Sequence, residues 1–344
     1  MKVEPLIDYP LLLARVGELY NLPVRALTFV PEGETSIAYV VSCSDGQRYF
    51  LKLWPGSRQG LAMRARLDTV LPLTHELYER GLIPNLACPI RSAVGSLLNS
   101  YGDYALALFL FKDGKPLPED RAAWPQDMLE QLAGTYARLH QATRLVKSPL
   151  PQRPAFDMNF AADLRRGLDA LDFISLHDRP GLLRLRDLLM PRREELLRRL
   201  GEVEVLRILA QQRAGPLVLC HTDMGGNNLL IDSTGRLSIL DWDELILAPA
   251  EHDLHEYRGD GFAQFIELYY RAGGVQSLQP VQFAFYLKRR YLADLTDWLV
   301  RILEENTSLE QDHYDLEGIV IYSLAYLDRF PAEIEEITAA LASV

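Results

Sequence analysis

Two neighbouring stretches of the chain decide the fold. They read Leu219-Cys220-His221-Thr222-Asp223-Met224-Gly225-Gly226-Asn227-Asn228-Leu229-Leu230-Ile231 and, a few residues later, Ile239-Leu240-Asp241-Trp242-Asp243. Polar side chains stand here between short apolar runs of the kind that form strands. The connection Asp232-Ser233-Thr234-Gly235-Arg236 is typical of a hairpin turn. We therefore expect Asp223, Asn228 and Asp241 to converge at the mouths of adjacent strands.

Such a convergence of oxygen-bearing side chains indicates a specific chemistry. Carboxylate and amide oxygens suit Mg²⁺, which completes its coordination with water and substrate phosphates. Phosphoryl transfer needs a carboxylate for the attacking hydroxyl, an amide and a carboxylate for the metal, and a cation for the phosphates. Lys52, near the end of an expected strand, can supply that cation. The residues therefore predict phosphoryl transfer.

The amino-acid composition limits the classes of partner that the protein is expected to bind. The 344 residues are 48% hydrophobic, which excludes a disordered chain, and their number suggests about two domains at roughly 150 residues each. Lys and Arg number 36 against 47 Asp and Glu, giving a net charge of −11. This balance argues against sequence-independent nucleic-acid binding, which needs clustered basic residues. It favours a cationic small-molecule partner.

Membrane and disulfide signals are both weak. The longest apolar run, 104–111, is far shorter than the roughly 20 residues that span a bilayer, so we expect no membrane association. The N-terminal residues do not resemble a signal peptide, so we expect a cytoplasmic protein. Cys43, Cys88 and Cys220 are scattered and odd in number, which predicts buried reduced thiols.

The periodicity of the chain predicts its elements. Apolar spacing indicates a helix near 12–20, three antiparallel strands within 27–53, and a helix over 67–78 in which Pro72 lies near the start or makes a kink. Turn residues mark an interlobe linker at 111–118. Beyond it we expect helices at 128–142, within 160–213 and from 262 to the end, interrupted by strands at 217–220, 229–231 and 237–240.

The order of these motifs resembles the aminoglycoside phosphotransferase family, and within it the spectinomycin phosphotransferase-like members. The family's His-x-Asp-x-x-x-x-Asn motif matches His221, Asp223 and Asn228, and its Ile-Asp-Trp motif matches 240–242. The resemblance implies a two-lobed α+β fold of the protein-kinase type. Residues 1–110 would form a small antiparallel β-sheet lobe, 111–118 the linker, and 119–344 a mainly helical lobe with the catalytic loops and the acceptor pocket.

The resemblance also assigns roles by position. Asp223 would be the catalytic carboxylate, His221 would orient its loop, Asn228 and Asp241 would bind Mg²⁺, and Lys52 would hold the phosphates of ATP. The family pairs this lysine with a helix glutamate, for which Asp68 aligns best and Glu76 is the alternative. Further nucleotide contacts would come from the turn before the second strand and from the linker, at Gly33, Thr35, Ser36, Leu110 and Phe111.

The acceptor is expected to be an aminoglycoside or aminocyclitol whose phosphorylation confers resistance. Protonated amines form charge-assisted hydrogen bonds with carboxylates, and the candidate carboxylates are Asp260, Asp294, Asp297 and Glu244. Two alternatives stay open. One is a metabolic kinase of the same fold acting on choline, homoserine, a hydroxylated amino acid or a sugar amine, and the other is an inactive nucleotide-binding scaffold. Either a monomer or a homodimer is compatible with the sequence.

Overall fold

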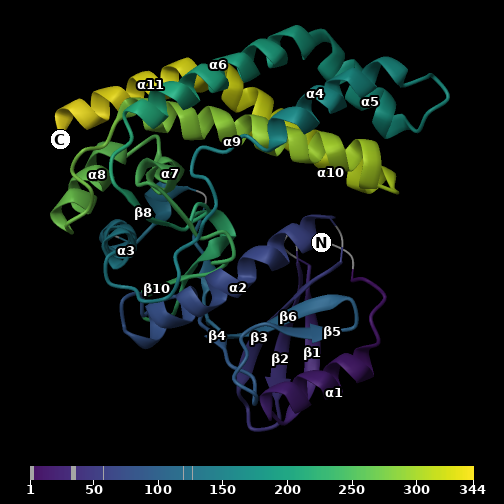
Figure 1. Cartoon of the computed structure of the whole chain (residues 1–344), viewed down its shortest axis with the longest axis vertical. Coiled ribbons are helices and arrows are strands. Elements are labelled where there is room, and N and C mark those ends of the chain that lie inside the picture. Colours follow the sequence, from purple (N-terminus) through teal and green to yellow (C-terminus); the bar gives the residue numbers. More distant parts are fainter. Residues whose placement is uncertain (1–3, 32–35, 57, 119, 126) are drawn as a thin grey trace. The chain divides into compact units, whose positions relative to one another are not determined.

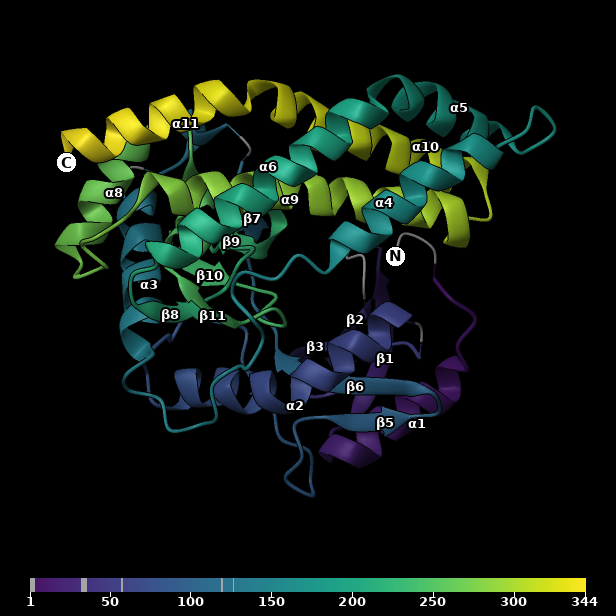
Figure 2. The same ribbon diagram turned by 45° about the horizontal axis from the view of Figure 1, so that its top comes forward.

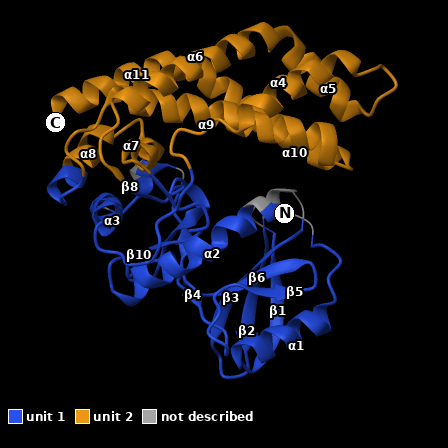
Figure 3. Cartoon of the chain, viewed as in Figure 1, with its two compact units in different colours: residues 1–153, 218–247, 268–274 blue, residues 154–217, 248–267, 275–344 orange. Residues whose placement is uncertain are grey.

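The computed structural model describes residues 4–31, 36–56, 58–118, 120–125 and 127–344 (Figures 1 and 2). Contacts divide the chain into two compact units (Figure 3). Unit 1 comprises 1–153, 218–247 and 268–274, and unit 2 comprises 154–217, 248–267 and 275–344. Unit 1 thus joins the N-terminal segment, the expected linker and both motif-bearing stretches, so a boundary between lobes at 111–118 stays a prediction.

An antiparallel sheet forms the first part of unit 1. Its strands are β1 (Val24–Val30), β2 (Ile37–Cys43), β3 (Arg48–Trp54), β4 (Pro89–Ile90), β5 (Asn99–Tyr101) and β6 (Tyr104–Leu110). They are ordered β1-β2-β3-β6-β4, with β5 also paired to β6. The β2–β3 turn contains Gly46 at φ +86°, a conformation that glycine adopts without strain. The three strands expected within 27–53 are therefore confirmed.

One helix packs on each face of this sheet. Helix α1 (Tyr9–Tyr20) buries Leu12 and Val16 against one face, and Asp8 caps its N-terminus by accepting a hydrogen bond from the backbone N–H of Leu11. Helix α2 (Arg58–Glu79) packs Leu67 and its neighbours on the other face, with Trp54 and Phe109. Pro72 lies in the middle of α2 and not near its start, because packing against the sheet supports the helix on both sides of the proline.

The two motif-bearing stretches form short strands in unit 1, next to α3 (Met128–Ala142). Strands β9 (Leu229–Ile231) and β10 (Leu237–Ile239) form the expected hairpin, and β8 (Leu217–Cys220) pairs with β11 (Ile246–Pro249). The linker is not a free connection, because its residues 115–116 form β7 (Lys115–Pro116), which pairs with β9. Ile239 also exchanges backbone hydrogen bonds with Asn85 and Ala87, so the hairpin is attached directly to the segment after α2.

Unit 2 is helical. It contains α4 (Phe160–Ala170), α5 (Pro180–Leu189), α6 (Arg193–Gln212), α7 (Glu251–Leu254), α9 (Pro280–Val300), α10 (Leu309–Gly318) and α11 (Ala325–Ser343), while α8 (Phe262–Arg271) begins in it and ends in unit 1. Figures 1 and 2 both show α9 alongside α4, α6 and α11, which pack against it. Across both units, short 3₁₀ turns cover Arg121–Ala123, Leu171–Phe173, Met190–Arg192, Gly226–Asn228 and His255–Tyr257. π-Helical turns cover Arg301–Glu305 and Ile319–Leu324.

Two expectations from composition can be compared with this fold. No helix among the described residues is long and apolar enough to cross a membrane. The three cysteines, Cys43, Cys88 and Cys220, are all described, and all three are free and buried. The prediction of buried reduced thiols is confirmed.

Candidate active site

His221 joins the two motif-bearing loops. Its ring is fully buried, and its Nε2 lies 2.8 Å from the carbonyl oxygen of Leu240. Its Nδ1 accepts a hydrogen bond from the backbone N–H of Asp223 at 3.3 Å, and its ring lies edge-on to Trp242 with 4.7 Å between centroids. Because one nitrogen must carry the proton donated to Leu240 while the other accepts, these contacts select one tautomer. This geometry supports an orienting role for His221.

Asp223 and Asn228 lie together in the loop after β8. The Nδ2 of Asn228 donates to the backbone oxygen of Asp223 at 3.0 Å and to its carboxylate Oδ2 at 2.8 Å. The Tyr136 hydroxyl, from α3, donates to the carbonyl of Met224 and so attaches the loop to that helix. Both bonds of the Asn228 side chain to Asp223 use its nitrogen, so the carboxamide oxygen is the atom that a cation would take.

Asp241 follows β10 in the left-handed region, at φ +56°. The backbone N–H of Leu240 donates to the backbone oxygen of Asn228 at 2.9 Å, which brings the two expected metal ligands onto adjacent, hydrogen-bonded segments. A carboxylate and a carboxamide oxygen are ligands that Mg²⁺ accepts readily. The donor set therefore fits this ion, with Asn228 and Asp241 as the residues that would hold it.

Lys52 reaches this loop from β3. Its Nζ lies 2.7 Å from Oδ1 of Asp241 and 2.9 Å from Oδ2 of Asp243. Burial would lower the pKa of Lys52, but the charges and hydrogen bonds of the two carboxylates outweigh it and raise that pKa. The surrounding protein partly desolvates Asp241, whose side chain is 45% exposed, and this would raise its pKa, yet attraction to Lys52 lowers that pKa. For Asp243, burial and the neighbouring charge of Asp241 raise the pKa.

Small residues flank Lys52 on the sheet. In the strand register Lys52 lies opposite Ala38 on β2 and opposite Ala107 on β6. The Phe109 ring, on the same face, has its centroid 5.9 Å from Nζ. Ala107 and Phe109 are buried in the core cluster that includes Leu67 of α2, so this face of the sheet next to Lys52 is packed against α2.

The prediction that a carboxylate on α2 pairs with Lys52 is wrong. Asp68 is exposed on α2, and the two described carboxylates bonded to Lys52 Nζ are Asp241 and Asp243. The alternative, Glu76, is occupied elsewhere, because its carboxylate accepts the backbone N–H groups of Lys147 and Ser148 at 2.7–3.0 Å. The carboxylate therefore comes from the loop after β10 and not from α2. Its only signal in the sequence is the spacing Asp241-Trp242-Asp243.

The remaining nucleotide predictions are placed only in part. Gly33 and Thr35 lie outside the described residues, while Ser36 is buried just before β2. The backbone N–H of Leu110 donates to the carbonyl of Cys88, and the Arg48 guanidinium lies 4.3 Å from the centre of the Phe111 ring. The roles of all these residues in nucleotide binding stay predictions.

The four acceptor candidates differ in their surroundings. Both carboxylate oxygens of Glu244 are bonded to arginines, Arg66 and Arg153, so Glu244 is not the available carboxylate that the sequence predicts. The other three lie in unit 2, where Asp260 precedes α8 and is exposed, and Asp294 and Asp297 lie on α9. Asp294 is 3.6 Å from Nε of Arg290, and Asp297 is exposed.

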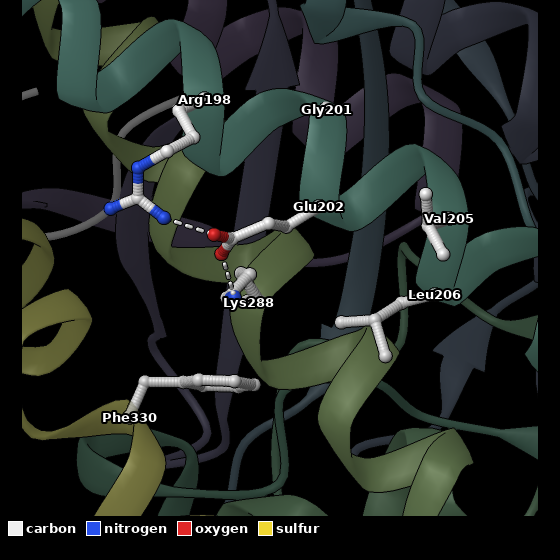
Figure 4. Close-up of a pocket in the computed structure, with 7 residues that line it drawn as sticks. All are labelled: Arg198, Gly201, Glu202, Val205, Leu206, Lys288 and Phe330. Atoms are coloured by element: carbon white, nitrogen blue, oxygen red, sulfur yellow. Dashed lines mark hydrogen bonds and ion pairs between the residues drawn. The ribbon is translucent and has the colours of Figure 1, made fainter.

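A pocket of about 540 Å³ in unit 2 contains none of these four residues. Figure 4 shows its lining: Arg198, Gly201, Glu202, Val205, Leu206, Lys288 and Phe330. The Glu202 carboxylate is bonded to both Arg198 and Lys288, and the Lys288 ammonium lies 4.2 Å from the centre of the Phe330 ring. Because its acid is already neutralised, this pocket does not provide a carboxylate for a cationic acceptor.

Comparisons with known proteins place the fold of this chain among solved structures. Among solved structures, a spectinomycin phosphotransferase in complex with ADP and spectinomycin aligns over 91% of this chain and 95% of its own, with 18% identity and a TM-score of 0.71. A microcompartment-associated aminopropanol kinase aligns over 96% and 99%, with 16% identity and a TM-score of 0.60. A choline kinase from Cryptosporidium parvum aligns over 93% of each chain, with 15% identity and a TM-score of 0.55.

These structural likenesses show a shared kinase-like fold. A search of curated proteins finds no match. The profile of the phosphotransferase enzyme family matches residues 26–282, which is more than half of the chain and includes both motif-bearing loops and Lys52. The family and fold expected from the sequence are therefore confirmed: this chain belongs to the phosphotransferase enzyme family and has its kinase-like fold.

Proposed function

We propose that this enzyme uses ATP and Mg²⁺ to phosphorylate a hydroxyl group of an amine-bearing small molecule, an aminoglycoside or aminocyclitol related to spectinomycin. The observation that carries the proposal is the joining of Lys52, Asp241 and the Asp223–Asn228 loop through direct hydrogen bonds. These groups are the cation, the metal-binding carboxylate and the hydroxyl-orienting carboxylate that phosphoryl transfer requires.

Each residue has a defined task in this reaction. Asp223 accepts a hydrogen bond from the acceptor hydroxyl and takes its proton as the hydroxyl oxygen attacks the γ-phosphorus. The bond between the γ-phosphorus and the oxygen bridging to the β-phosphate breaks, and ADP leaves. Lys52 neutralises phosphate charge. Asn228 and Asp241 would hold the Mg²⁺, which when bound would supply charge neutralisation on the transferred group.

The cationic acceptor is supported by charge and by chemistry. The net charge of −11 attracts cations, and Asp260, Asp294 and Asp297 remain our proposed ligands for acceptor amines. Three enzymes of the same fold are named as kinases or phosphotransferases of spectinomycin, aminopropanol and choline. Each of these compounds carries both a hydroxyl and an amine or ammonium group. If the amino-sugar acceptor is correct, phosphorylation would inactivate an antibiotic and confer resistance.

The same comparison favours one alternative, a metabolic kinase of a simple amino alcohol such as choline or aminopropanol. A panel assay separates the two functions. ADP release by the full chain with MgATP is measured against spectinomycin, other aminoglycosides, choline, aminopropanol and homoserine, with Asp223→Asn as the control. Turnover with an aminoglycoside or aminocyclitol supports the proposal, whereas turnover restricted to simple amino alcohols or homoserine overturns the acceptor class. Tight ATP binding without any transfer would instead indicate a scaffold.

A further inference from the structure

Helix α2 contacts the phosphate-binding region through an arginine. The Arg66 Nη1 donates to both carboxylate oxygens of Glu244, at 2.6 and 2.7 Å, and Arg153 donates to the same carboxylate. All three side chains are about one-third exposed or less, so these ion pairs are partly shielded from water. Glu244 is therefore held from two directions, by α2 and by the segment that ends unit 1's first part.

Glu244 directly follows the two partners of Lys52. Asp241 and Asp243 occupy one turn of chain with Lys52 Nζ between their carboxylates. Their environments differ sharply, because the side chain of Asp241 is 45% exposed and that of Asp243 is 5% exposed. A metal ion with its phosphates and waters can reach Asp241, whereas Asp243 is enclosed with the lysine.

We propose that Asp243 and Glu244 are positioning residues that together replace a carboxylate on α2. Asp243 holds Lys52 in place when Asp241 binds the metal, and the Arg66–Glu244–Arg153 cluster holds the loop that carries both aspartates. This inference rests on the proposed function, since it assumes that Lys52 and Asp241 bind MgATP. It explains how α2 stays coupled to the site although Asp68 is exposed and Glu76 binds backbone amides.

The physical reason lies in competition for Asp241. A carboxylate bound to a divalent cation is a poor partner for an ammonium group, because the cation repels that ammonium. A buried lysine left without a counter-charge would be strongly disfavoured. Asp243 removes this conflict by keeping one carboxylate on Lys52 in both states. In this structure its Oδ2 lies 2.9 Å from Nζ.

Binding of ATP to the full chain, measured by calorimetry with and without Mg²⁺, tests Asp243 without any acceptor. Asp243→Asn keeps the shape of the side chain and removes its charge. We expect about tenfold weaker ATP binding in the presence of Mg²⁺, the scale of one charge-assisted hydrogen bond, and a smaller loss without Mg²⁺, because Asp241 then still holds Lys52. Asp241→Asn should abolish the factor by which Mg²⁺ strengthens ATP binding. Unchanged MgATP affinity in Asp243→Asn, or an equal loss with and without Mg²⁺, would overturn the proposal. Complete loss of the Mg²⁺ factor in Asp243→Asn would also overturn it, because Asp243 would then be a metal ligand.

The arginine cluster provides an independent arm. Arg66→Gln and Glu244→Gln should each weaken MgATP binding several-fold, and the double variant should lose no more than the weaker-binding single variant, because the two residues form one interaction. Arg80→Gln is the matched control, since Arg80 also lies at α2 but pairs with Glu76. Additive losses, or equal losses in the control, would refute the coupling. This arm also decides the matter if Asp243→Asn does not fold. Failure of the unaltered chain to bind MgATP would instead remove the proposed function itself.

Discussion

Glu251 makes the stability of the protein depend on pH near neutrality. Its side chain is almost fully buried at the start of α7, where a carboxylate oxygen accepts the backbone N–H of Gln279 at 2.6 Å. Burial raises the pKa of Glu251 from its ordinary value of 4.5 to about 7, and the hydrogen bonds from the backbone only partly offset this. Folding therefore favours the protonated acid over the carboxylate.

The direction and size of the effect follow from proton linkage. An acid whose pKa is raised by folding stabilises the protein fully below pH 4.5, and this contribution is lost as the pH rises through 7. At about 1.4 kcal/mol per unit, the loss between pH 5 and pH 8 amounts to about 2.5 kcal/mol. Glu251→Gln removes the titration and keeps an oxygen acceptor for Gln279.

The assay is urea unfolding of both proteins at pH 5 and pH 8, followed by circular dichroism. The difference in unfolding free energy between variant and unaltered protein should shift by about 2.5 kcal/mol in favour of the variant from pH 5 to pH 8. Any pH-independent cost of burying the amide cancels in this comparison.

Glu76→Gln is the matched control. Burial would raise the pKa of Glu76, but hydrogen bonds from Ser148, Arg80 and Lys147 lower it to about 2, so its titration lies outside this pH range. A difference for Glu251→Gln that is equal at both pH values would refute the reasoning.

Four further outcomes are expected. Asp223→Ala should lower kcat by about 10²–10⁴ with ATP affinity retained by calorimetry, and near-normal turnover would contradict its role as the hydroxyl-orienting base. Asp241→Ala should lose Mg²⁺-dependent nucleotide binding, so unchanged MgATP affinity would exclude the metal role. In α4, a Cβ on Gly167 would lie 2.6 Å from a methyl of Leu299, so Gly167→Ala should destabilise the protein by about 1–3 kcal/mol in thermal unfolding. In α6, a Cβ on Gly201 would meet open space, so Gly201→Ala should stabilise the protein by about 0.5–1 kcal/mol.

Sequence reasoning placed the local elements well where strong signals were close together. The helix predicted at 128–142 and the strand predicted at 229–231 coincide with the observed elements, and the strand predicted at 237–240 ends one residue earlier, because apolar periodicity and turn residues act over a few positions. Pro72 was harder to place, since a helix can contain a proline when packing supports both of its sides. The sequence does not predict strand β7, because this strand forms only through its pairing with β9.

The candidate site likewise contains residues that the motifs indicate and contacts that only the folded chain shows. Motif order and spacing within 221–241 were sufficient to indicate the family, and the resemblance then predicted roles for Asp223, Asn228 and Asp241 and for Lys52 on an upstream strand. The partner of Lys52 lies 191 residues away in the chain, and the choice among candidate acids depended on which side chain the folded backbone brings to Nζ.

Sequence alone thus determined many of the element types through local periodicity, and it indicated the kinase-like fold through the family resemblance that the motifs carry. Only the tertiary structure decided that Asp243 and not Asp68 pairs with Lys52, and that Glu244 is neutralised by Arg66 and Arg153. The physical reason is that an ion pair depends on distance and burial, which are properties of the packed chain. Neither can be read from the order of residues when the partners are far apart in sequence.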